Sequence, residues 1–351
     1  MRFLPSDSPA VRIALGGSVL DLPRIGARAE AYVTSVPMLY FGNETRPVVG
    51  RVGRIEFGET VRCARVRFHL PNFLENEISK DGGYAITHVG VVERIDGSAL
   101  SLNDSEPVLD CLGHYLSFCR GSWTFPVLLC AENAEGCVVG QRWELSNTID
   151  RYKQTRPWLP RNEPEGTHLS EAFRGYAYAW FSALWGDAIR IATQWYVESS
   201  SGAVEKSIIL TQAAFELLGW TRLVEDTHTL SEKVWKSRSM SFAEKLRQLL
   251  QSCTVPLSVP AELDQLLAYS KALRVSDGPE ALTSLRNALV HPSPSKRKRI
   301  QEHPGATVDA WKLGLWYLDL IFLHVCGYKS RYSNKTIWGW PADDAMAVPW
   351  V

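Results

Sequence analysis

The stretch FRGYAYAWFSALWGDAIRIATQW, residues 173–195, decides the fold class of the second half of the chain. Its large apolar residues recur at steps of three and four, which is the spacing of one face of an α-helix. These positions are Phe173, Tyr176, Trp180, Leu184, Ala188, Ile191 and Trp195. The pattern predicts one long amphipathic helix of about 30 residues that buries this face.

Similar periodic stretches follow along the rest of the chain. We expect helices at 204–225, 241–253, 261–273, 279–291 and 309–327. Together they predict an all-α helical bundle over residues 169–330. Residues 331–351 form a tail rich in tryptophan, and we expect this tail to pack on the bundle, with docking on a partner as the alternative.

The first half of the chain has a different pattern. From about residue 10 to 145, short apolar runs are separated by turn signals such as GGS, FGNE, DGG and AENAEG. This predicts a β-rich N-terminal domain at residues 1–150. Three prolines in residues 151–168 indicate an extended linker. The fold class is therefore α+β multidomain, a β-rich domain followed by an all-α bundle.

The composition is that of a globular protein without a strong charge bias. The 351 residues include 38 Lys and Arg, 38 Asp and Glu, and 45% hydrophobic residues. This balance excludes a disordered chain and gives no bulk attraction to a polyanion, so any nucleic-acid site must be local.

A cytoplasmic location is expected. Pro5, Asp7 and Pro9 interrupt the segment that a signal peptide would need to be apolar. The most apolar helical stretch contains Asp319 and His324 and is shorter than the roughly 20 residues of a membrane span, so we expect no membrane association. Seven cysteines without a close pair fit reduced thiols.

The stretch SLRNALVHPSPSKRKR, residues 284–299, carries the candidate chemistry. Asn287 and His291 are four residues apart and about 40° from each other on a helix, whereas Arg286 and His291 are about 140° apart. Pro292 disfavours helical geometry at His291, so the helix should end there and let the imidazole turn. Histidine moves protons, arginine holds a phosphate in a planar fork, and asparagine orients either, which suits phosphodiester chemistry without a metal ion.

The residues Arg286, Asn287 and His291, spaced R-N-x-x-x-H late in an all-α bundle, resemble the ribonuclease motif of HEPN domains. This resemblance implies a homodimer in which two motif helices meet and cut RNA through the ribose 2′-hydroxyl, with neither metal nor cofactor. Members recur as toxins, CRISPR effectors and antiphage proteins, with tRNA among the substrates to consider. The resemblance assigns proton transfer to His291, phosphate or transition-state stabilisation to Arg286, and orientation of the site to Asn287.

Two further groups are candidates for supporting roles. Lys296, Arg297, Lys298 and Arg299 follow the motif in an expected loop broken by prolines, where they would grip the RNA backbone or simply face solvent. Glu216 has apolar neighbours that suggest partial burial, so it is a candidate for orienting the motif.

Alternatives remain for the function as a whole. A helix C-terminus favours basic side chains through its dipole alone, so the motif has a purely structural interpretation. A catalytically silent HEPN bundle would serve as a dimerisation module or adaptor. In the preferred interpretation the partners are RNA, a second copy of the chain, and a phage or host trigger at the N-terminal domain.

Overall fold

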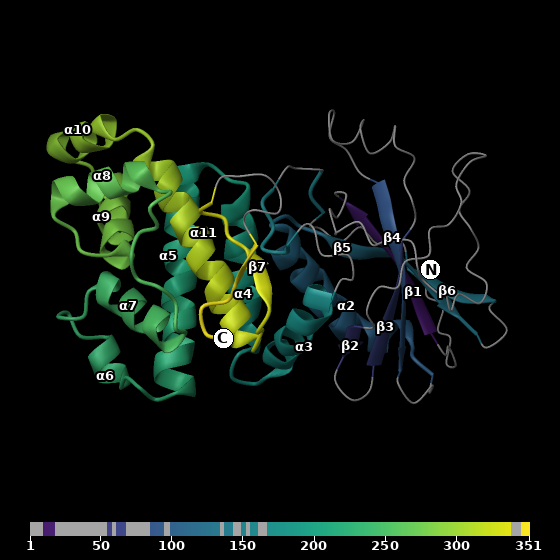
Figure 1. The fold of residues 1–351 in the computed structure, drawn as a ribbon. Coiled ribbons are helices and arrows are strands. Elements are labelled where there is room, and N and C mark those ends of the chain that lie inside the picture. The colour runs from purple at the N-terminus through teal and green to yellow at the C-terminus, as the bar shows by residue number, and fades with distance from the viewer. Residues whose placement is uncertain are drawn as a thin grey trace. The chain divides into compact units, whose positions relative to one another are not determined.

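The computed structural model describes residues 10–17, 55–57, 61–67, 85–94, 99–133, 137–142, 149–151, 155–160, 167–337 and 345–351 (Figure 1). Contacts divide the chain into two compact units. The first combines Met1–Thr155 with Arg161–Tyr178, and the second combines Arg156–Pro160 with Ala179–Val351. This division differs from the predicted boundaries, because the start of the first long helix groups with the first unit and the tail groups with the second.

The first unit contains a six-stranded antiparallel sheet. Its strands are β1 (Ala10–Gly17), β2 (Ile55–Phe57), β3 (Val61–Arg67), β4 (Ala85–Arg94), β5 (Phe125–Glu132) and β6 (Val138–Arg142). Their spatial order is β2-β3-β4-β1-β5-β6. β1 lies in the middle, where Arg12 is opposite Val91 on one side and Cys130 on the other.

Helix α2 (Leu102–Arg120) lies between β4 and β5, where the sequence pattern predicted only strands. Ser101 Oγ accepts a hydrogen bond from the Asp104 N–H at 3.1 Å, which caps the first turn. Gly113 lies so close to β5 that an added Cβ would be 2.2 Å from Phe125 Cδ1. The Ser-x-x-Asp start was the available signal, but the turn-rich sequence around it favoured a continuous run of strands.

The predicted single long helix at 173–195 is wrong, because the structure has two helices there. α3 (Thr167–Phe181) ends before Ser182, and α4 (Gly186–Ser200) begins four residues later. Ser182 Oγ accepts hydrogen bonds from the N–H groups of Leu184 and Trp185, at 3.1 and 3.3 Å. A serine hydroxyl that takes backbone donors competes with the helical pattern, which explains the break.

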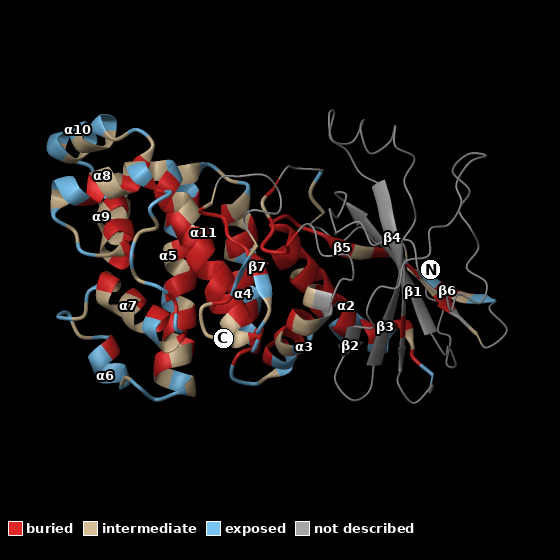
Figure 2. Cartoon of the chain, viewed as in Figure 1, coloured by how far each residue is buried: buried red, intermediate tan, exposed pale blue. Residues whose placement is uncertain are grey.

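The second unit is helical, as the apolar period predicted. After α4 come α5 (Val204–Trp220), the π-helix η1 (Thr221–Asp226), α6 (Glu232–Trp235), α7 (Phe242–Ser252), α8 (Asp264–Leu273), α9 (Gly278–Val290), α10 (Pro294–Glu302) and α11 (Ala306–Val325). The short α6 and α10 were not predicted. α11 contacts α4, α5, α8 and α9 and most of its residues are buried, whereas α10 is largely exposed (Figure 2). No described helix is both long and apolar enough to cross a membrane.

The C-terminal tail packs within the second unit. Its strands β7 (Arg331–Ser333) and β8 (Ala345–Ala347) pair with each other, and Trp350 Nε1 donates to the Tyr328 carbonyl at 2.7 Å. Two tryptophans of the predicted tail, Trp338 and Trp340, lie outside the described residues.

A buried ion pair fastens the tail to the helices of this unit. Lys335 Nζ donates to Asp319 Oδ1 at 2.8 Å and also to the Tyr196 hydroxyl, which itself donates to Asp319 at 2.7 Å. The side chains of Lys335 and Asp319 are 5% and 0% exposed. Burial raises the pKa of Asp319 and lowers that of Lys335, while their attraction opposes both shifts.

Replacing Lys335 with Met would leave the Asp319 carboxylate buried without its cation. We expect the free energy of unfolding to fall by about 3–5 kcal/mol at neutral pH, measured by guanidinium chloride unfolding. The loss should shrink at acidic pH. Burial raises the folded-state pKa of the Asp319 carboxyl group above its unfolded-state pKa. Such a group contributes stability at pH values below its unfolded-state pKa, and this contribution is lost as the pH rises through the folded-state pKa.

The double variant Asp319→Leu/Lys335→Met removes both charges together and is the matched control. It should recover most of the lost stability, because neither charge is then buried alone. A double variant as unstable as Lys335→Met would contradict this account of the pair.

Candidate functional site

The motif helix α9 begins with a capped first turn. Asp277 Oδ1 accepts a hydrogen bond from the Glu280 N–H at 3.0 Å, and Pro279 occupies the first turn. Ser276 donates to Glu280 Oε2 through its N–H at 3.2 Å and its hydroxyl at 3.0 Å. The helix predicted at 279–291 therefore begins within one residue of its expected start, and the Asp277 bond satisfies an N–H group that a helix start leaves open.

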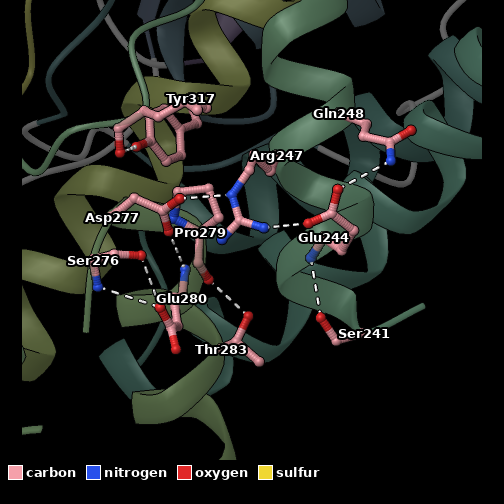
Figure 3. Close-up of polar contacts among 11 residues, drawn as sticks. Ser241, Glu244, Arg247, Gln248, Ser276, Asp277, Pro279, Glu280, Thr283 and Tyr317 are labelled. Carbon is pink, nitrogen blue, oxygen red and sulfur yellow. Dashed lines mark hydrogen bonds and ion pairs between the residues drawn. The ribbon is translucent and has the colours of Figure 1, made fainter. Parts of the chain in front are cut away.

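An ion pair attaches this start to α7 (Figure 3). Arg247 Nε donates to Asp277 Oδ2 at 2.7 Å, and its Nη1 is paired with Glu244. The hydrogen bond that Arg247 donates to Asp277, together with the charges of Asp277 and Glu244, raises the pKa of Arg247 despite partial burial. Asp277 thus serves as helix cap and ion-pair partner at once, which ties α9 to its neighbour.

Close packing at Gly278 fixes the same end of α9. The Gly278 N–H donates to the Leu257 carbonyl at 2.7 Å, and Tyr317 Oη donates to the same carbonyl at 3.2 Å. A Cβ on Gly278 would lie 2.1 Å from Tyr317 Oη. Burial raises the pKa of Tyr317, so its hydroxyl remains a proton donor. Only a residue without a side chain fits this position.

His291 ends α9, as its position before Pro292 predicted. Its backbone has φ −120° and ψ 70°, and its N–H donates to the Asn287 carbonyl at 3.1 Å. His291 is exposed, whereas Arg286 and Asn287 are half-buried. The motif therefore lies at the solvent-facing end of the helix.

Arg286 and Asn287 interact directly. Arg286 Nη1 donates to Asn287 Oδ1 at 3.2 Å. Arg286 Nε is buried and has no hydrogen-bond partner among the described residues, and no described carboxylate forms an ion pair with this guanidinium. Within one chain the structure brings Arg286 to Asn287, but no hydrogen bond joins either side chain to the His291 imidazole.

The predicted partial burial of Glu216 is wrong. Glu216 is exposed on α5 and accepts a hydrogen bond from Gln212 Nε2 at 3.2 Å. Its neighbours Phe215 and Leu218 are buried, but a step of one residue turns a helix by about 100°, so Glu216 points away from their face. In the described part of the chain it contacts neither Arg286 nor His291 through an ion pair.

The basic cluster Lys296–Arg299 was expected in a loop and instead lies on α10. Ser293 Oγ caps this helix by accepting from the Lys296 N–H at 3.3 Å, and Pro294 is in its first turn. Proline is tolerated there because the first N–H groups of a helix have no partner within it. Lys296 and Arg299 are half-buried, while Arg297 and Lys298 are exposed.

Metal ligands do not gather in the described residues, where no group of three or more His, Cys, Asp or Glu side chains is placed to hold a metal ion.

Two domain models match separate parts of the chain. Residues 74–155 match the YopA central domain, and residues 182–343 match the YopA C-terminal domain. The chain is 30% identical over 263 residues to the SPbeta prophage-derived uncharacterized protein YopA of Bacillus subtilis (strain 168), covering 74% of this chain. It spans 57% of the length of that relative. No solved structure matches the chain.

Replacing Asp277 with Ala tests the attachment of the motif helix. We expect a loss of about 2 kcal/mol in the free energy of unfolding, because both the cap and the partner of Arg247 disappear. Asp277→Asn keeps a capping oxygen and removes the charge, so it should cost less than half as much. Urea unfolding of the three proteins measures both losses, and equal losses would show that the cap contributes nothing.

Proposed function

We propose that this chain is a metal-independent endoribonuclease of the HEPN type, acting as a homodimer. The proposal rests on the exposure of His291 and on the unpaired charge of Arg286 in the described part of the chain, at the end of α9. A phosphate would supply the missing negative charge. The all-α surroundings of the motif agree with the resemblance.

The proposed reaction needs only side-chain chemistry. His291 removes the proton of a ribose 2′-hydroxyl, the 2′-oxygen attacks the adjacent phosphorus, and the bond to the 5′-oxygen breaks. The leaving 5′-oxygen takes a proton from a second donor, which in the proposed homodimer is in the motif of the second copy. Arg286 stabilises the charge on the phosphate oxygens, and Asn287 holds Arg286 through the bond between their side chains.

A role in conflict between phage and host is part of the proposal. The relative is prophage-derived, and the HEPN resemblance implies toxins and antiphage effectors. In this proposal the first unit senses a phage or host trigger and the second cuts RNA, with tRNA as the first substrate to test. A cytoplasmic site of action follows from the substrate.

Replacing His291 with Ala should slow RNA cleavage by about 10²–10⁴-fold, the usual contribution of a general acid or base. Arg286→Ala should cost about 10²–10³-fold through lost charge stabilisation. His303→Ala is a matched control, because His303 also ends a helix before a proline, with φ −130° and ψ 67°. Cleavage of labelled tRNA in EDTA gives the rates.

The control should cleave at the wild-type rate. RNA cleavage by His291→Ala at the rate of an active wild type would contradict the proposal. If a folded dimer cleaves no RNA with or without the N-terminal trigger, the catalytically silent HEPN module becomes the better account.

A further inference from the structure

The four cations of α10 do not act alike, although they adjoin one another in the sequence. Lys296 turns back toward α9, where its Nζ donates to the Asn287 carbonyl at 3.3 Å and the His291 carbonyl at 3.0 Å. Arg297 and Lys298 are exposed. Arg299 lies near Tyr269 of α8. Burial raises the pKa of the Tyr269 hydroxyl, and the positive charge of Arg299 opposes this rise in part.

The reason for the Lys296 contact is a missing backbone donor. At the end of α10, the His303 carbonyl accepts from the Ala306 N–H three residues later, at 3.0 Å. The corresponding residue after His291 is Pro294, which has no N–H. The His291 carbonyl therefore has no such donor, and the Lys296 ammonium takes its place.

We propose that Lys296 is a positioning residue for His291, while Arg297 and Lys298 bind RNA phosphates. This inference rests on the proposed ribonuclease function. Lys296 donates to the carbonyl of His291, and the N–H of His291 donates to the Asn287 carbonyl in α9. Both backbone groups of His291 are therefore fixed, and with them the direction of its imidazole. A cation at a helix C-terminus is also favoured by the helix dipole.

The two roles predict different kinetic changes. Lys296→Met should lower kcat about tenfold or more and leave KM unchanged, because positioning acts on the chemical step. Lys296→Arg restores a charged donor and should recover most of kcat. The variant Arg297→Ala/Lys298→Ala should instead raise KM, because phosphate contacts serve binding.

RNA binding separates the roles without any cleavage. The probe is a single-stranded RNA with 2′-O-methyl groups, which has no nucleophile. Each lost phosphate contact reduces the slope of log K against log salt by about 0.7, so Arg297→Ala/Lys298→Ala should reduce it by about 1.4. Lys296→Met should leave the slope unchanged. A reduction of about 0.7 by Lys296→Met would make Lys296 an ordinary phosphate contact and overturn the inference.

Amide hydrogen exchange of His291 decides the positioning role even if the protein cleaves no RNA. Lys296→Met should speed exchange of this amide about tenfold, while Lys298→Met on the exposed side of α10 should leave it unchanged. Unchanged exchange in Lys296→Met would overturn the positioning role. If the wild type cleaves no RNA and Lys296→Met still speeds exchange of the His291 amide, the ribonuclease function is rejected. The role of Lys296 in holding the His291 backbone is then retained.

Discussion

The ion pair between Arg247 and Asp277 is the interaction on which the candidate site depends. Asp277 starts α9, and Arg247 fixes that start to α7, while Gly278 seats it against the Leu257 carbonyl. A helix of 13 residues fixed at one end carries its far end to a defined place. His291 is at that far end, so its position is set by contacts made more than three turns away.

The second constraint acts at the other end of α9 and comes from proline. Pro292 ends the helix at His291, and Pro294 starts α10 while removing the N–H that would hold the His291 carbonyl. Lys296 supplies that donor from the first turn of the new helix. Pro292, Pro294 and Lys296 thus form a short connection between α9 and α10. His291 is exposed there, and its backbone carbonyl is held by Lys296.

Most helices of the second unit can be predicted from the sequence alone, because apolar residues recur at helical spacing several times within each helix. The helices that became α5, α9 and α11 each extend over several apolar repeats, so one misleading residue cannot hide them. The break between α3 and α4 depends on the hydroxyl of Ser182 alone. The apolar residues on both sides keep the helical period, so the sequence predicts one continuous helix. The Arg247–Asp277 pair joins residues 30 positions apart, for which no local signal exists. Pro292, Pro294 and Pro304 predict a loop at the basic cluster, whereas Pro294 lies in the first turn of a helix that Ser293 caps.

The ends of RNA fragments made in EDTA show which oxygen attacks the phosphorus. Purified wild-type protein and His291→Ala are incubated with total RNA, and the fragment ends are identified by mass spectrometry. The proposed mechanism predicts 2′,3′-cyclic phosphate and 5′-hydroxyl ends that the variant does not produce, because attack by the 2′-oxygen closes the cyclic phosphate and expels the 5′-oxygen. Fragments with 5′-phosphate ends, or cyclic phosphate ends made equally by His291→Ala, would contradict it.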